Sequence, residues 1–222
     1  MNRETIIGIL GGMGPYATSF FFKRLLDITP AKLDKDHFRT IIDNNVKIPS
    51  RTRAVKYNEQ SPVNDIVSSI NNLSKVGCTC VMLPCNSAHY FYGTVSKKIV
   101  IPWLNMIEIV SNKMSDLNYV RPLILGGFVT THTQIYSKYL PGSVYLTNTE
   151  NRKIESIIEE VKSTNNISKI SEKSLNDIIN NYNDSIDSIL LACTELPIVI
   201  KENSFEGKKV ISSIDEYINY LI

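Results

Sequence analysis

The fold is decided by two short stretches of the same shape, VMLPCNSAH at residues 81–89 and ILLACTELP at residues 189–197. In each stretch an apolar run stops at a cysteine, Cys85 or Cys193, and a small polar residue follows. A short apolar run bounded by turn residues is typical of a buried parallel strand. Each cysteine would then lie at the carboxyl end of its strand, where open α/β sheets bind their ligands.

The composition suits a soluble globular protein and excludes several classes of partner. Apolar residues make up 43% of the 222 residues and charged residues 21%, enough for one large domain or two small ones. The net charge of +2 gives no reason to expect nucleic acid or a membrane surface as a partner. No apolar run approaches the roughly 18 residues of a membrane span. The first residues lead into a strand without a secretory signal, so we expect a cytoplasmic protein with reduced cysteines.

An internal repeat predicts two similar halves. Residues 123–128, LILGGF, resemble residues 8–13, GILGGM, and the spacing between these motifs is close to that between the two cysteines. We therefore predict an α/β fold of two Rossmann-like lobes with parallel sheets. The first lobe would be residues 1–99 with about 209–222, and the second residues 100–208. A cleft between two such lobes is a favoured place for a small-molecule site.

The hydrophobic periodicity of the chain predicts its other elements. We expect strands at residues 5–10, 39–44, 78–83, 99–101 and 210–211. We expect helices from about residue 16 and at residues 62–76, 105–114, 151–162, 174–182, 197–202 and 214–221, the last packing on the first lobe. Residues 31–37 and 47–53 are predicted as loops, and Gly77 as the residue that ends a helix.

The turn GGMGP at residues 11–15 needs a permissive backbone after the first strand. It lacks the G-x-G-x-x-G spacing of a dinucleotide fingerprint, so no nucleotide cofactor is predicted. We expect the turn instead to offer backbone N–H groups to an anion at the start of the following helix.

Cys85 and Cys193 are candidates for acid–base chemistry. A free thiol has a pKa of about 8.5, and a helix N-terminus with its backbone N–H groups lowers that pKa, which we expect for both cysteines. Two thiols on opposed lobes could move a proton at one carbon, the thiolate accepting it on one face and the thiol donating on the other. Asn86, Ser87 and Thr194 follow the cysteines and could hydrogen-bond a carboxylate there.

Each candidate also has a structural interpretation. A strand-end cysteine is often part of the core, and for Cys78 and Cys80 within their strand this interpretation is preferred. The Cys-x-Cys pair has no second ligand pair at metal-binding spacing, so no metal site is predicted. For His89 a cap or core hydrogen bond is favoured over tuning of a neighbouring thiol. Arg51 reads by default as a solvated loop charge, and Lys162 as a cation favoured at a helix end.

Three stretches resemble the signatures of the aspartate/glutamate racemase family, namely residues 11–18, 84–89 and 192–197. Residues 34–37 and 48–52 also resemble its aspartate racemase branch. The motifs stand in the right order and the similarity covers nearly the whole chain. The resemblance implies two lobes related by a pseudo-twofold axis with the active site in the cleft between them. It implies a homodimer that racemises aspartate, and also glutamate, without a cofactor by a two-base thiol/thiolate mechanism.

The resemblance also assigns roles to residues. It implies Cys85 and Cys193 as the catalytic pair, and Arg51 and Lys162 as the cations for the distal carboxylate of an acidic amino-acid substrate. The residues it implies at the amino-acid end of the substrate are Met13, Asn86, Ser87, Thr130 and Thr194.

Three positions depart from the family pattern. Ser87 stands where threonine is usual and keeps the hydroxyl. Ala192 stands where glycine is usual and adds a methyl group beside the thiol. Ser50 stands where aspartate is usual and removes a carboxylate next to Arg51, which bears on the choice of substrate.

Other functions fit the same residues. Within the superfamily these are maleate isomerisation, in which a cysteine acts as a nucleophile, hydantoin racemisation and malonate decarboxylation. The cysteine pair argues against a decarboxylase, which normally keeps one of the two cysteines. A non-catalytic binder of acidic amino acids would use the same cleft and the same cations.

Overall fold

The computed structural model describes residues 5–201 and 204–222, which form two compact units. The first unit runs to Met106 and also contains Tyr217–Ile222, and the second unit is Ile107–Glu216. The sequence-based division has its boundaries at residue 99 and at about residue 209. The expectation for residues 1–4 and the predicted helix end at residue 202 lie outside the described residues.

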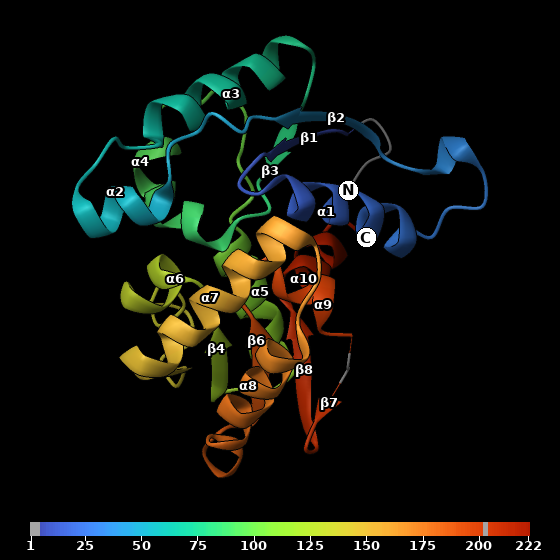
Figure 1. Cartoon of the computed structure of the whole chain (residues 1–222). Helices are drawn as coiled ribbons and strands as arrows, with labels where there is room; N and C mark the ends of the chain where they lie inside the picture. Colours follow the sequence, from blue (N-terminus) through green and yellow to red (C-terminus); the bar gives the residue numbers. More distant parts are fainter. Residues whose placement is uncertain (1–4, 202–203) are drawn as a thin grey trace. The chain divides into compact units, whose positions relative to one another are not determined.

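A three-stranded parallel sheet forms the centre of the first unit (Figure 1). Its strands are β1 (Ile6–Gly11), β2 (Arg39–Asn44) and β3 (Cys80–Met82), in the order β2-β1-β3. In the central strand, Ile7 is in register with Thr40 of β2 and Cys80 of β3. Helices α1 (Pro15–Ile28) and α3 (Val63–Lys75) lie on either side of β1, so that this strand is apolar and almost wholly buried.

Helix α3 follows from its apolar spacing. Ile66, Ile70 and Leu73 recur at helical intervals and pack with Leu10 of β1 in one core cluster. The helix ends before Gly77, whose φ of 96° is the left-handed conformation that glycine adopts at no steric cost. The prediction of this helix and of the residue that ends it is confirmed.

Two predictions in the first unit are wrong. The expected loop at residues 47–53 gives way to helix α2 (Arg51–Tyr57), because the Ser50 hydroxyl accepts the Arg53 N–H at 3.3 Å and caps the helix. The expected strand at residues 99–101 is absent from the described residues, where only a bridge between Val81 and Trp103 forms. Pro102 has no N–H to donate, so the ladder cannot extend through it.

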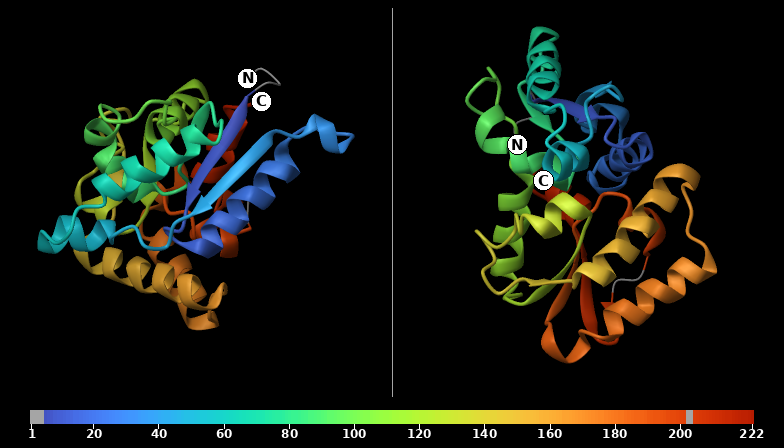
Figure 2. Two further views of the ribbon diagram at one scale, coloured as in Figure 1. Left: turned by 90° about the horizontal axis from the view of Figure 1, so that it is seen from above. Right: turned by 60° about the vertical axis from the view of Figure 1, so that its left-hand side comes forward.

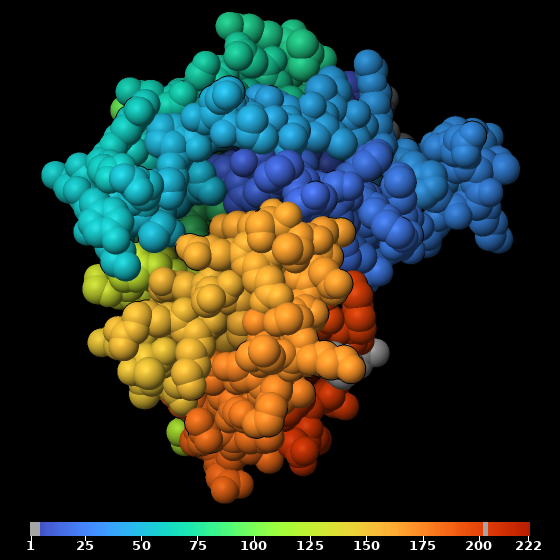
Figure 3. All heavy atoms as spheres, in the orientation of Figure 1, coloured from blue at the N-terminus to red at the C-terminus, as the bar shows by residue number. Residues whose placement is uncertain are grey.

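The segment between α1 and β2 projects from the first unit (Figures 2 and 3). It contains the short 3-10 turn η1 (Asp34–Asp36), and Leu33 beside it is exposed. Because this segment leads into β2 at Arg39, it lies at the amino-terminal ends of the parallel strands. The motif at residues 34–37 is therefore at the opposite end of the strands from the residues that follow β3.

A five-stranded sheet forms the centre of the second unit. Its strands are β4 (Pro122–Leu125), β5 (Val144–Tyr145), β6 (Ser188–Leu191), β7 (Ser204–Phe205) and β8 (Lys208–Ser212), in the order β5-β4-β6-β8-β7. All neighbours are parallel except β7 and β8. The order β5-β4-β6 repeats the order β2-β1-β3 of the first unit, so β6 corresponds to β3 and the predicted repeat has a counterpart in topology.

Helices surround this second sheet, and several start at a side-chain cap. Thr147 and Glu150 form a capping box for α7 (Asn148–Thr164), and the Ser168 hydroxyl caps α8 (Lys169–Asn180). Ile154 and Ile157 of α7 pack with Leu125 of β4 in the core. The remaining helical segments of the two units are η2 (Asn86–Phe91), α4 (Tyr92–Val95), α5 (Met106–Asp116), α6 (Phe128–His132), η3 (Asn183–Ser185), α9 (Leu196–Val199) and α10 (Ser213–Asn219). Within the described ranges, no helix combines the length and apolarity that a bilayer crossing demands.

Candidate active site

Cys85 lies just beyond the carboxyl end of β3, as predicted. Its backbone is extended, with φ −156° and ψ 104°, and it precedes η2 as the N-cap residue. The Tyr217 hydroxyl, from the end of the chain, accepts the Leu83 N–H at 3.3 Å and donates to the Leu104 carbonyl at 2.6 Å. The strand end that carries Cys85 is therefore anchored by a fully buried phenol.

His89 fixes the same turn from its other side. The Met106 N–H donates to His89 Nε2 at 3.1 Å, so the ring proton is on Nδ1, which donates to the Cys85 carbonyl at 2.9 Å. Burial lowers the pKa of His89 to about 4, against the weaker opposing effect of its backbone hydrogen bonds. The ring is thus neutral and structural, which confirms the core hydrogen bond preferred for it, and it holds the Cys85 backbone in place.

The Gly-rich turn after β1 is closed by Thr18. The Thr18 hydroxyl accepts the Gly12 N–H and donates to the Gly14 carbonyl, each at 2.9 Å. Gly12 has a φ of 88°, and a Cβ there would meet the Asn45 carbonyl carbon at 2.3 Å. The prediction of free N–H groups for an anion is therefore wrong for Gly12, whose N–H is already bonded. The Met13 carbonyl of this turn accepts a hydrogen bond from Arg51.

Arg51 joins this turn to the loop after β2. Its Nη1 donates to the carbonyls of Pro49 at 2.9 Å and Ile48 at 3.4 Å, and its Nη2 donates to the Met13 carbonyl at 3.4 Å. Among the described residues, its buried Nε has no hydrogen-bond partner, and the bonds that the structure gives the guanidinium go to backbone carbonyls. Carbonyl oxygens leave the positive charge unneutralised, so Arg51 is a half-buried cation suited to an anion. The default interpretation of a solvated loop charge is wrong.

Asn86 and Ser87 follow Cys85 directly and open η2. The Asn86 side chain is buried, and Ser87 is half-buried. Met13 is in the same core cluster as Cys85. Ile48, whose carbonyl accepts a hydrogen bond from Arg51, belongs to this cluster too. The structure thus brings the predicted residues of the first unit together around the carboxyl ends of β1, β2 and β3.

Cys193 lies two residues beyond β6, at the position in the second unit that Cys85 has in the first. The Ala192 N–H donates to the Leu125 carbonyl at 2.8 Å, which ties this strand end to β4. The Cys193 sulfur donates to Glu195 Oε2 at 3.0 Å, and the Thr194 hydroxyl donates to the same oxygen at 3.3 Å. Both Thr194 and Glu195 are 2% exposed.

The environment of Cys193 overturns one prediction. Burial raises the pKa of the Cys193 thiol well above its usual value, and the Glu195 carboxylate raises it further, while Lys162 acts in the opposite direction. The expected lowering by a helix N-terminus is wrong because the following helix α9 has only four residues and a buried carboxylate faces the sulfur. Sequence reasoning missed Glu195, whose signal was a carboxylate two residues after a strand-end cysteine.

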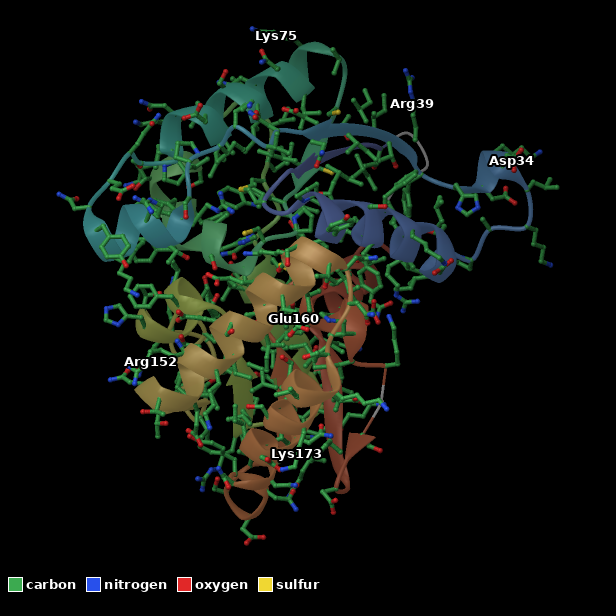
Figure 4. The ribbon with its side chains drawn as sticks, in the orientation of Figure 1. Asp34, Arg39, Lys75, Arg152, Glu160 and Lys173 are labelled. Atoms are coloured by element: carbon green, nitrogen blue, oxygen red, sulfur yellow. The ribbon has the colours of Figure 1, made fainter. Side chains whose placement is uncertain are left out.

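The other predicted residues of the second unit are Thr130 and Lys162. Thr130 is fully buried in α6 beside Gly126, and within the described chain its hydroxyl has no hydrogen-bond partner. Lys162 is exposed in the last turn of α7 and acts electrostatically on Cys193. Glu160, on the same helix (Figure 4), instead accepts the Ser168 N–H at 2.8 Å and so secures the start of α8.

The other two cysteines, Cys78 and Cys80, lie in the core of the first unit. Cys78 and Cys80 are buried, and burial raises the pKa of both thiols, as expected for core residues. In the part of the chain that the structure describes, no three His, Cys, Asp or Glu side chains gather as metal ligands would. A cavity of about 100 Å³ opens between α8, β6 and β8, lined chiefly by apolar side chains, and none of the predicted site residues lines it.

Comparisons with known proteins bear on the family and the fold of the chain. A family model described as Asp/Glu/hydantoin racemase matches residues 10–221. The chain is 26% identical over 204 residues to the broad specificity amino-acid racemase RacX of Bacillus subtilis (strain 168), covering 88% of this chain and 87% of that protein. The Picrophilus torridus aspartate racemase structure is 31% identical, with a TM-score of 0.87 over 98% of this chain and 93% of that one. Glutamate racemase isoform RacE1 of Bacillus anthracis shares the fold, at 17% identity and a TM-score of 0.67, over 99% and 81% of the chains.

Proposed function

Since the chain belongs to the Asp/Glu/hydantoin racemase family, we propose that it racemises aspartate, and also glutamate, without a cofactor. The family makes it an amino-acid racemase that acts on small amino-acid substrates. Aspartate is supported by the 31% identity to the Picrophilus torridus aspartate racemase. Glutamate is included because the matching family is described as Asp/Glu/hydantoin racemase. We further propose a cytoplasmic homodimer, on the resemblance described above.

The observation that carries the proposal is the equivalence of the two cysteines. Each follows the strand next to the central one, β3 beside β1 and β6 beside β4, in units of the same strand order. In the proposed reaction, one sulfur as thiolate takes the α-proton, and the electron pair stays on the α-carbon, delocalised into the carboxylate. The other sulfur as thiol gives its proton to the opposite face and becomes the thiolate.

Polar groups beside the cysteines would bind the amino-acid end of the substrate. Asn86, Ser87 and Thr194 carry hydrogen-bonding side chains directly after the two sulfurs, and we assign Met13 and Thr130 to the same end. Charge that develops on the α-carboxylate as the proton leaves is stabilised by donors fixed in advance. The turn at Cys85 meets this need, because His89 and Tyr217 hold its backbone.

Arg51 and Lys162 would bind the distal carboxylate. Arg51 supports this role through its half-buried guanidinium, whose bonds run to carbonyl oxygens and whose Nε is buried without a partner in the described structure. A carboxylate accepts from such a guanidinium in a charge-assisted hydrogen bond. Ser50, which precedes Arg51, has no charge to compete for it.

The test is racemisation of L-aspartate in D₂O without pyridoxal phosphate. We expect D-aspartate to form with deuterium at the α-position, because the second proton comes from a thiol in exchange with solvent. Cys85→Ala and Cys193→Ala should each abolish racemisation. Full turnover in either variant would remove the two-base mechanism, and binding of aspartate without α-proton exchange would indicate a binding protein instead.

A further inference from the structure

The second unit places a buried carboxylate against one of the two sulfurs. Glu195 is 2% exposed, and its Oε2 receives both the Cys193 S–H at 3.0 Å and the Thr194 O–H at 3.3 Å. Its other oxygen, Oε1, is buried without a hydrogen-bond partner in the described residues. A buried carboxylate is costly unless donors satisfy it, so this one depends on the thiol proton.

We infer that Glu195 is a positioning residue that keeps Cys193 in its protonated form and aims the S–H along a fixed direction. The inference rests on the proposed function, in which one sulfur must hold a proton while the other is a thiolate. An ionised sulfur 3.0 Å from an ionised carboxylate would face a like charge in a poorly solvated place. The opposing charge acting on this sulfur is Lys162 of α7, which is exposed and screened by solvent.

The first unit has no such carboxylate at the equivalent place. The residue two positions after Cys85 is Ser87, where the second unit has Glu195. A hydroxyl can donate to sulfur, whereas a carboxylate can only accept. The contact between sulfur and carboxylate is therefore a feature of Cys193, which we assign as the resting proton donor.

The asymmetry must be measured on the thiols themselves. The two enantiomers of an amino acid are equally stable, so kcat/KM is the same in both directions whatever the resting roles of the cysteines. The pH dependence of alkylation reports the thiolate directly, because only the thiolate reacts. It also needs no substrate, which separates this inference from the proposed function.

The experiment follows iodoacetamide alkylation of Cys193 against pH in the full chain, with each cysteine peptide quantified by mass spectrometry. In Glu195→Gln the amide has the shape of the carboxylate without its charge. The midpoint for Cys193 should fall by at least one pH unit, about a tenfold gain in alkylation rate near neutral pH. Asp184→Asn removes one charge at the opposite end of β6, from an exposed residue, and should leave the midpoint unchanged.

Folding is controlled within the same measurement. Cys78 and Cys80 are buried, so their alkylation reports unfolding. If Glu195→Gln unfolds, Glu195→Asp is used in its place. Its carboxylate is farther from the Cys193 sulfur by one methylene, so the midpoint of Cys193 alkylation should fall by less than expected for Glu195→Gln. An unchanged midpoint in the folded variant, or an equal shift in Asp184→Asn, overturns the inference. A shifted midpoint in a chain that racemises no amino acid would overturn the proposed function and leave the inferred effect of Glu195 on Cys193 intact.

Discussion

The hydroxyl of Tyr217 accepts a hydrogen bond from the backbone N–H of Leu83, two residues before Cys85, although Tyr217 and Leu83 are 134 residues apart in sequence. The same hydroxyl donates to the Leu104 carbonyl at 2.6 Å. The last helix of the chain thus supports the turn that carries the first cysteine.

Tyr217→Phe removes both of these hydrogen bonds and leaves the buried Leu83 N–H and the half-buried Leu104 carbonyl without this partner. We expect a loss of unfolding free energy of about 1–3 kcal/mol, measured by urea denaturation. Tyr220→Phe is the control, because Tyr220 is 53% exposed. Equal stability of the two variants would show that the hydrogen bonds of the Tyr217 hydroxyl do not stabilise the folded chain.

His89 should make stability depend on pH. Its pKa is about 4 in the folded chain, below its usual value of 6.5, so the unfolded chain binds the proton more readily. The stabilisation from the neutral ring is therefore complete above pH 6.5 and is lost as the pH falls toward 4, on the order of 3 kcal/mol in total. Denaturation of His89→Gln should show a flatter pH dependence over this range, whereas the exposed His132→Gln should keep that of the parent.

Arg51→Gln should raise KM for aspartate. The variant keeps hydrogen-bonding groups but loses the charge that would hold the distal carboxylate, an effect on the order of 10- to 100-fold. Arg53→Gln is the matched control, since Arg53 lies on the same helix, is exposed, and pairs with Glu59 at 2.6 Å. A KM that rises equally in both variants would point to lost helix stability instead of substrate binding.

Gly12→Ala should damage the turn after β1. Its φ of 88° disfavours any side chain, and the new Cβ would meet the Asn45 carbonyl carbon at 2.3 Å. We expect a thermal melt to show destabilisation by at least about 1–3 kcal/mol, with loss of activity as Met13 moves. Gly93→Ala in α4 should be neutral or stabilising, because nothing lies within 4 Å of that Cβ and alanine favours helix. A tolerated Gly12→Ala would mean that the turn is not fixed as described.

Much of the fold could be predicted because its signals are local. The apolar runs at β1, β3 and β6, the cysteine after each of the last two, and Gly77 after α3 all follow from neighbouring residues. The wrong predictions of helix and strand bounds have local causes too. Ser50 is an N-cap that starts α2, Ser168 starts α8 earlier than expected, and Pro102 stops a strand.

The motifs named candidate site residues, but they did not give the electrostatics around them. The motifs named Cys193, but its raised pKa depends on burial and on the position of the Glu195 carboxylate, which are set by the folded chain. Likewise, the motifs named Arg51 as a candidate, but the carbonyls that its guanidinium contacts come from two backbone segments, at Met13 and at residues 48–49, which meet only in the folded chain. Long-range contacts of this kind leave no periodic signal in a sequence.

The shared strand order β2-β1-β3 and β5-β4-β6 is what duplication of a half-length ancestor produces. Directly after such a duplication, both copies would have carried the same residue two places after the cysteine. The present chain has serine in one copy and glutamate in the other, so the role that we infer for Glu195 would have arisen after the duplication and in one copy alone.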